Sequence, residues 1–235
     1  MLWKQEYHNK RYMNFAMTAQ TGLKHINSMP GRIMKYIAVQ FGNPHGFGGQ
    51  ISTFIMNCLN MRQYHAVERL LLIEPGNKIL DIGFGNGYLI RYLNRNYPST
   101  QLYGIDISED MLRTALQKSH EAISNGNMHL TIADVVSLPF EDESFERIYT
   151  VNTHYFWSDI DKGLQEIRRV MKPDALFLIV GHYKKYLDRL PIAKYNFKKY
   201  EIEEIEVLLQ KNGLVLERNI CVEKYKSYCL TIRKK

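Results

Sequence analysis

A turn of three glycines preceded by an acid is the part of the sequence with the clearest chemical meaning. Asp81 is followed by Gly83, Gly85 and Gly87 in the string DIGFGNG. Glycines at this spacing let the backbone turn sharply and let a ligand approach without a Cβ in the way. The dinucleotide fingerprint G-x-G-x-x-G would need a glycine at Tyr88, so this pattern is a different one. The turn alone is weak evidence for a ligand, because a tight strand-to-helix turn also needs glycine.

Two further acids end the next two apolar runs of the chain. Asp106 closes QLYGID, 23 residues after Gly83, close to the spacing of about 20 expected for an acid that accepts both ribose hydroxyls. Asp134 closes MHLTIAD, where it could accept from the exocyclic amine of an adenine or serve as a turn or cap residue. Three acids at three successive strand ends, together with the glycine turn, predict a site for a nucleoside-containing ligand.

Alternating strands and helices from residue 78 onward would position these side chains. Helices are expected at residues 87–96, 108–122, 162–171 and 201–213, the last closed by Gly213. The strands are expected at residues 78–83, 101–107, 128–134, 146–152, 175–180, 214–222 and 227–234. This order predicts a Rossmann-like, doubly wound α/β domain with a mostly parallel seven-stranded sheet and an antiparallel last strand.

The first 72 residues have a different character and read as helical. A helix over residues 53–72 is expected to end at Pro75-Gly76. The segment is interrupted at Met29-Pro30-Gly31 and by the glycine-rich run at residues 42–49. We therefore divide the chain into an N-terminal segment, residues 1–72, and a domain at residues 73–235.

Composition and charge narrow the class of protein. The formal net charge is +7, and residues 1–47 and 181–200 each carry six lysines or arginines against one acid. Such basic segments attract nucleic acid or an anionic ligand, or form a solvated lysine-rich surface. The three cysteines lack C-x-x-C spacing, so neither a disulfide framework nor a metal site is expected. The absence of a secretory signal and of a run long enough to span a membrane favours a cytoplasmic location.

The motifs taken together resemble a known family. KILDIGFGNG, LYGIDIS, IADVVSLPF and GLQEIRRVMKPDALFLIV look like the successive motifs of class I S-adenosylmethionine-dependent methyltransferases, of the small-molecule type related to the ubiquinone/menaquinone methyltransferases. The resemblance covers roughly residues 78–180, with a weaker match through Gly213 and the final strands. It implies S-adenosylmethionine as cofactor and S-adenosylhomocysteine as product.

The resemblance also implies roles for single residues. It places Asp81 in the cofactor site, Gly83, Gly85 and Gly87 beside the methionyl part, and Asn152 near the sulfonium. Asp106 would take the ribose hydroxyls with Ile107 against the adenine, and Asp134 the adenine amine with Val135 beside it. Two positions depart from the family: Phe84 stands where a small residue or cysteine is usual, and KPDA replaces K-P-G-G before the fifth strand.

Acceptor chemistry is expected at VNTHYFWSD, after the fourth strand. Methyl transfer from a sulfonium needs a general base only if the acceptor keeps a proton. His154 is the leading candidate for that base, with Tyr155 beside it as a second catalytic candidate. Tyr155 and Trp157 could form an aromatic wall for a flat acceptor or an amine. In the alternative interpretation these aromatics pack under the next helix and His154 is a hydrogen-bonded core residue.

Two segments are expected to shape the acceptor site. By the resemblance, residues 1–72 would form a lid or substrate segment, or else a structural helix pair that covers the sheet edge. Residues 181–200, with His182 and Tyr183 at their start, could form a substrate flap or a nucleic-acid rim. The lid side chains that could line the acceptor site are His45, Phe47, Tyr64 and His65.

Three classes of function follow from these observations. The first is a methyltransferase acting on an O, N or C atom of a small molecule. The alternative is an RNA methyltransferase that uses the two basic segments, since Asn152 and Tyr155 have the N-x-x-Y spacing of exocyclic-amine methylases but lack the two prolines between them. The third, a cofactor-binding module without catalysis, is disfavoured by the intact glycines and acids. No oligomeric state is predicted.

Overall fold

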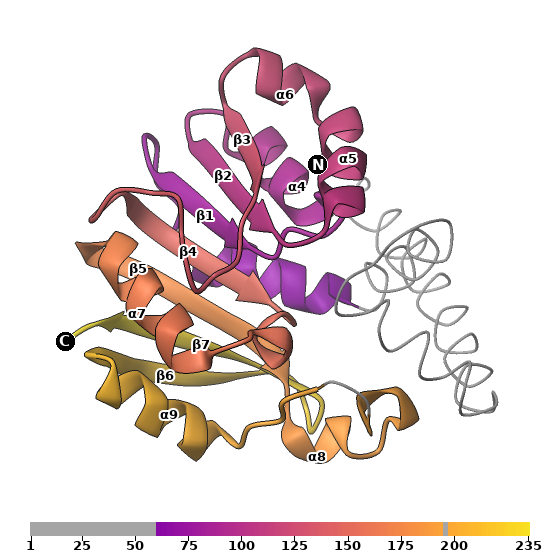
Figure 1. Ribbon diagram of the computed structural model, residues 1–235, viewed down its shortest axis with the longest axis vertical. Helices are drawn as coiled ribbons and strands as arrows, with labels where there is room; N and C mark the ends of the chain where they lie inside the picture. The colour runs from indigo at the N-terminus through magenta and orange to yellow at the C-terminus, as the bar shows by residue number, and fades with distance from the viewer. Residues whose placement is uncertain (1–59, 195–196) are drawn as a thin grey trace, which may run out of the picture.

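The computed structural model describes residues 60–194 and 197–235, which contain a seven-stranded sheet (Figure 1). The spatial order is β3-β2-β1-β4-β5-β7-β6. Strands β1 to β5 pair in parallel, whereas β7 runs antiparallel to both β5 and β6. The predicted Rossmann-like sheet with an antiparallel last strand is confirmed. The strands are β1 (Lys78–Ile82), β2 (Gln101–Asp106), β3 (Met128–Ile132), β4 (Phe145–Val151), β5 (Met171–His182), β6 (Leu214–Glu223) and β7 (Ser227–Lys234).

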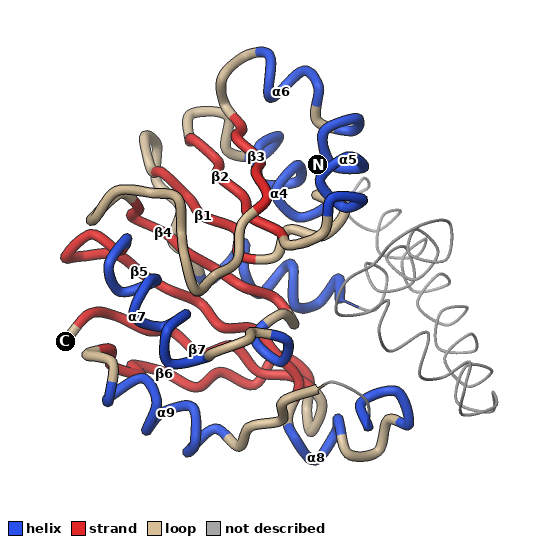
Figure 2. The backbone as a smooth tube through the Cα atoms, in the orientation of Figure 1, coloured by secondary structure: helices blue, strands red, loops and turns tan. Residues whose placement is uncertain are grey.

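Helices cover both faces of this sheet (Figures 1 and 2). Residues 60–70 are helical and precede β1. The prediction of a single helix over residues 108–122 is wrong. The helix is interrupted at Ser119, which is the C-cap of α5 and the N-cap of α6. The labelled elements are α4 (Tyr88–Asn96), α5 (Glu109–Lys118), α6 (His120–Ser124), α7 (Ile160–Val170), α8 (Lys184–Leu187), α9 (Ile202–Lys211) and the 3₁₀ turns η1 (His154–Phe156) and η2 (Pro191–Lys194).

The two faces of the sheet form two separate cores. Along β5, the side chains of Ala175, Phe177 and Ile179 enter one core, which α7 and α9 cover. The alternate residues Leu176 and Leu178 enter the other, which α4 and residues 60–70 cover. This alternation follows from the two-residue period of a strand, and burial on both faces is typical of a central parallel strand. The sheet is therefore a rigid support whose strand ends hold their side chains in fixed positions.

The N-terminal segment is only partly described. Val67, on helical residues 60–70, and Leu71, just after them, belong to the core that also contains Ile79 of β1 and Leu93 of α4. Most of the lid expected over residues 1–72, including His45 and Phe47, falls at residues 1–59 and lies outside the described residues. No helix in the described part of the chain is both long and apolar enough to cross a membrane.

Candidate active site

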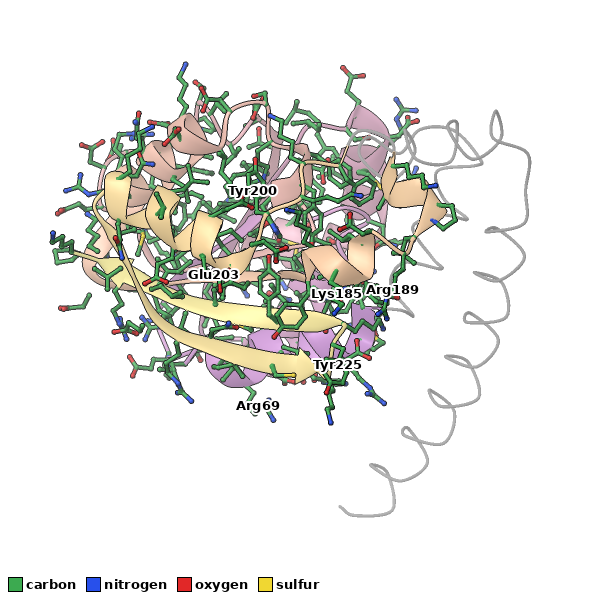
Figure 3. All side chains as sticks on the ribbon, turned by 90° about the horizontal axis from the view of Figure 1, so that it is seen from below. Arg69, Lys185, Arg189, Tyr200, Glu203 and Tyr225 are labelled. Carbon is green, nitrogen blue, oxygen red and sulfur yellow. The ribbon has the colours of Figure 1, made fainter. Side chains whose placement is uncertain are left out.

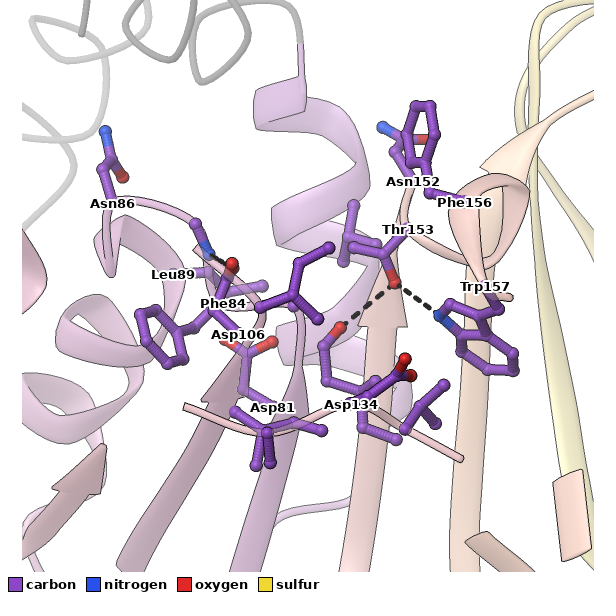
Figure 4. A pocket seen from close by; sticks show the side chains of 18 of the residues that line it. Asp81, Phe84, Asn86, Leu89, Asp106, Asp134, Asn152, Thr153, Phe156 and Trp157 are labelled. Atoms are coloured by element: carbon purple, nitrogen blue, oxygen red, sulfur yellow. Dashed lines mark hydrogen bonds between the residues drawn. The ribbon is translucent and has the colours of Figure 1, made fainter. Parts of the chain in front are cut away.

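A cavity of about 260 Å³ opens at the carboxyl ends of β1 to β4 (Figure 4). This is the edge at which open α/β sheets bind ligands. Asn60 and Tyr64, from helical residues 60–70, also reach it. Of the eleven predicted site residues, eight line the cavity: Asp81, Gly83, Gly85, Asp106, Ile107, Asp134, Val135 and Asn152.

The glycine turn adopts a backbone that other residues rarely adopt. Gly83, Gly85 and Gly87 have φ values of 81°, 55° and 72°, in the left-handed region. A Cβ on Gly83 would overlap the side chain of Thr153, so the turn lies directly against the loop after β4. A Cβ on Gly85 would meet no atom of the described residues within 4 Å, so this part of the chain leaves room for a ligand there. Gly87 does not line the cavity but begins α4 as its N-cap.

Asp106 is held at the end of β2 by the backbone around it. Its Oδ2 accepts from the N–H of Gly85 at 2.8 Å, and its Oδ1 accepts from the N–H of Ser108 at 2.9 Å. Burial raises the pKa of the carboxyl, which these backbone hydrogen bonds oppose. A carboxylate has about four acceptor positions, so Asp106 keeps capacity to accept from a ligand hydroxyl. The backbone thus holds the Asp106 carboxylate in a fixed orientation at the cavity.

Asp81 is a buried acid at the end of β1. It is 4% exposed, and the hydroxyl of Tyr149 donates to its Oδ2 at 2.8 Å. Burial raises the pKa of Asp81 to about 8, against the effect of the Tyr149 hydrogen bond. Because an uncompensated buried carboxylate is costly, a cation in the cavity would stabilise the ionised form. Asp81 therefore fits a ligand with an ammonium or sulfonium group.

The ends of β2 and β3 also present apolar surface beside their acids. Ile107 is 49% exposed at the cavity, whereas Val135 is buried. Asp134 accepts from the N–H of Val136 at 3.2 Å and from Ser158 Oγ at 3.4 Å, so it forms a turn as well as lining the cavity. A flat ring could pack on Ile107 while its edge faces Asp134.

Asn152, at the end of β4, is the centre of an amide network that sequence reasoning did not find. Its φ is 59°, and its Nδ2 donates to Asn60 Oδ1 at 3.1 Å and to Gln63 Oε1 at 2.7 Å. Gln63 Nε2 donates back to Asn152 Oδ1 at 3.2 Å. The three-residue spacing of Asn60 and Gln63 places both amides on one helix face, and this spacing could have been noticed in the sequence. The sequence does not indicate that this helix face lies against Asn152.

His154 lies beneath the site and not at it. It is 1% exposed, does not line the cavity, and shares a hydrogen bond of 3.1 Å between its Nε2 and the Tyr228 hydroxyl. Burial lowers its pKa to about 3, so it would be a weak base at neutral pH. The burial of His154 and its hydrogen bond to Tyr228 favour the core interpretation over the predicted role of a general base.

Tyr155 is likewise buried and does not line the cavity. Its ring stacks on Phe197 at 5.8 Å, and burial raises its pKa well above the usual value. This burial favours a core position for Tyr155 over the predicted catalytic role. The aromatic wall is formed instead by Phe156 and Trp157, which lie across the cavity from Phe84 (Figure 4).

Residues 181–200 pack beside the loop after β4. Lys198 Nζ donates to the carbonyls of Trp157 and Ser158 at 2.8 Å. His182 lies at the end of β5, where burial lowers its pKa to about 4, and neither it nor Tyr183 lines the cavity. Lys185, on α8, and Arg189, just after it, are exposed (Figure 3). The described part of this segment thus supports the wall of the site through residues 155–158.

Comparisons with known proteins agree with the geometry. Residues 79–174 match the model of a methyltransferase domain family. The chain is 36% identical over 112 residues to a 2-phytyl-1,4-naphtoquinone methyltransferase of Trichormus variabilis, which covers 47% of this chain and 49% of the relative. It is 28% identical over 180 residues to the uncharacterized methyltransferase YdaC of Bacillus subtilis, covering 73% and 95% of the two chains.

A solved structure shows the same fold. The SAM-dependent methyltransferase from Aquifex aeolicus is 21% identical, with a TM-score of 0.66 over 88% of this chain and 100% of that chain. The chain spans about half the length of the naphtoquinone methyltransferase that it matches, and nearly the whole of YdaC. Residues 79–174, which match the methyltransferase domain family, contain the glycine turn and all three acids.

Proposed function

We propose that this chain transfers the methyl group of S-adenosylmethionine to a small flat acceptor. In this proposal residues 79–174 form a class I S-adenosylmethionine-dependent methyltransferase domain of the small-molecule type. One observation carries the proposal. Asp81, Asp106 and Asp134, from three neighbouring strands, line the same cavity as the glycine turn. Capping or turn formation alone would not require the three acids to converge.

The described residues fit the cofactor in two parts. The ends of β2 and β3 offer Asp106, Ile107 and Asp134 to an adenosine. The ends of β1 and β4 offer Asp81 and the turn at Gly83 to an amino-acid part that carries positive charge. When bound, S-adenosylmethionine supplies a methyl group already activated on a sulfonium. The protein's task is then to align that group with the acceptor and to exclude water.

The aromatic residues on the β4 side support a flat acceptor. Trp157 is 5% exposed, and its Nε1 donates to Thr153 Oγ1 at 3.3 Å, which fixes the orientation of the indole. Phe156 and Tyr64 line the same region. Aromatic rings pack favourably on one another in offset or edge-to-face arrangements, so a ring-shaped acceptor fits this wall better than a flexible chain. The name of the naphtoquinone relative points to the same chemical class.

The acceptor would itself supply the nucleophile. Among the described residues that line the cavity there is no histidine, lysine or cysteine. A hydroxylated ring ionised at its hydroxyl carries electron density on oxygen and on the adjacent carbon without a general base. Its electron pair would form the bond to the methyl carbon, and the electrons of the broken carbon–sulfur bond would remain on sulfur. If carbon is the acceptor atom, the ring then loses a proton to water.

Nothing in the described residues favours the RNA alternative. In the basic segment 181–200, Lys199 contacts Asp188, Lys184 contacts Glu201, and Lys198 is bonded to backbone carbonyls. Three of the six lysines and arginines of this segment are therefore bound to groups of the chain itself. The basic segment at residues 1–47 lies outside the described residues.

The test is methyl transfer from S-adenosylmethionine labelled in its methyl group. The purified chain is incubated separately with reduced 1,4-naphthoquinone, phosphoethanolamine, a long-chain fatty acid and unmodified transfer RNA. We expect labelled product and S-adenosylhomocysteine with the hydroquinone. Labelling of the transfer RNA, or of only the non-aromatic acceptors, would contradict the proposal.

A further inference from the structure

Asn60 brings a side-chain amide to the cavity from outside the matched domain. It lies on the helix that precedes β1, 19 positions before the first residue of the family match. It is 6% exposed, and it lines the cavity together with Asn152. A polar side chain that is so deeply buried needs hydrogen-bond partners. The partners of its oxygen and of its nitrogen therefore indicate which atom can contact a ligand.

The amide network fixes the orientation of Asn60. Asn152 uses both hydrogens of its Nδ2, one toward Asn60 Oδ1 at 3.1 Å and one toward Gln63 Oε1 at 2.7 Å. Its Oδ1 accepts from Gln63 Nε2 at 3.2 Å and from the Tyr155 hydroxyl at 3.4 Å. Asn152 therefore has no donor left for a ligand. Because Asn60 must offer its oxygen to Asn152, its nitrogen is the atom that remains.

That nitrogen has no hydrogen-bond partner among the described residues. Within residues 60–194 and 197–235, the Nδ2 of Asn60 makes no hydrogen bond, although it carries two hydrogens. Because Asn60 lines the cavity, this nitrogen can donate to an acceptor of a ligand that enters it.

The position of Asn60 in the sheet indicates which ligand atoms it would meet. It is bonded to the residue that follows β4, and β4 lies beside β1 on the side away from β2 and β3. Asp106 and Asp134, which suit a ribose and an adenine, lie at the ends of β2 and β3. The amino-acid part of the cofactor must then extend toward β1 and β4. Asp81 would pair with its ammonium group, whereas its carboxylate group would need a hydrogen-bond donor.

We propose that the Nδ2 of Asn60 donates a hydrogen bond to the carboxylate of the amino-acid part of the cofactor, and that Gln63 positions this amide through Asn152. The inference rests on the cofactor assignment in the proposed function. It would extend the cofactor site to the N-terminal segment, so that cofactor binding and the placement of residues 60–70 support each other.

Calorimetric titration with two ligands tests the role of Asn60. S-adenosylhomocysteine has the carboxylate, whereas 5′-methylthioadenosine keeps the adenosine and sulfur but lacks the amino-acid part. In Asn60→Asp the side chain can still accept from Asn152, but an acceptor replaces the donor. Asn60→Ala is the second variant, and 5′-methylthioadenosine binding reports whether either variant keeps its fold.

The wild type is expected to bind S-adenosylhomocysteine more tightly than 5′-methylthioadenosine. Both Asn60 variants should weaken S-adenosylhomocysteine binding by about ten- to a hundredfold, the range for a hydrogen bond to a charged group, and leave 5′-methylthioadenosine binding nearly unchanged. The matched control is Gln63→Met, which removes a network partner that does not line the cavity. It should weaken S-adenosylhomocysteine binding less than either Asn60 variant does.

Two results would overturn the role of Asn60. One is unchanged S-adenosylhomocysteine affinity in both variants. The other is an equal loss for both ligands, which would make Asn60 a purely structural residue. A wild type that bound neither ligand would overturn the cofactor assignment itself, and the inference with it.

Discussion

The carboxylate of Asp106 accepts a hydrogen bond of 2.8 Å from the backbone N–H of Gly85, 21 residues earlier in the chain. This contact joins the end of β2 to the glycine turn after β1. The turn leaves open space at Gly85, where a side chain would otherwise stand. The acid that suits a ribose and the loop that makes room for a ligand are thus one structural unit.

The glycines of the turn should differ in their tolerance of alanine. Gly85→Ala places a left-handed φ on a non-glycine residue and should cost about 1 to 2 kcal/mol of unfolding free energy. Gly83→Ala has the same strain and also overlaps Thr153, so it should cost a further 1 to 3 kcal/mol or so. Urea unfolding of both variants measures the difference. Equal losses would show that Thr153 does not crowd Gly83.

The stability of the ligand-free protein should depend on pH through Asp81. Its folded pKa of about 8 lies far above its ordinary value of 3.8, so between these values the folded state binds more protons than the unfolded state. Unfolding free energy then falls as pH rises, with a slope approaching about 1.4 kcal/mol per pH unit. Asp81→Asn lacks this ionisation and can still accept from Tyr149. Its stability relative to the wild type should therefore rise from pH 5 to pH 8, as measured by urea unfolding; a constant difference would exclude the shifted pKa.

Replacing His154 should affect folding more than chemistry. His154→Ala leaves the buried Tyr228 hydroxyl without its partner, which should cost about 1 to 3 kcal/mol of unfolding free energy. Because burial holds the His154 pKa near 3, the pH profile of turnover between pH 5 and 8 should keep its shape in the variant. Tyr228→Phe, which removes the same hydrogen bond from the other side, is the control. An inflection near pH 6 to 7 that disappears only in His154→Ala would restore His154 as a base.

The strands and the glycine turn were predictable because their signals are local. The apolar run at β5 indicates a buried strand, and the closely spaced glycines indicate a sharp turn. Each pattern is complete within a few residues. The break at Ser119 was missed because residues 108–122 keep a continuous helical pattern across it. Such a break depends on tertiary packing, which a periodic pattern does not encode.

The acceptor side of the site was predicted less well for a related reason. His154 and Trp157 are three residues apart in one short loop, but only Trp157 lines the cavity. The 3₁₀ turn ends at Phe156, and the extended backbone of Trp157 directs its side chain away from the side that His154 occupies. A turn of three residues is too short to leave a periodic pattern in the sequence. Asn60 was missed because its partner, Asn152, lies 92 positions away.

The measurement that tests the central claim most directly is calorimetric titration of S-adenosylmethionine and S-adenosylhomocysteine into the wild type, Asp106→Ala and Asp174→Ala. Asp174 is an exposed acid of β5 that does not line the cavity, so its variant is the matched control. We expect the wild type and Asp174→Ala to bind both ligands alike. Asp106→Ala should bind about ten- to a hundredfold more weakly, because it loses charge-assisted hydrogen bonds to the ribose. Equal affinities in all three proteins, or no binding by the wild type, would contradict the cofactor site described above.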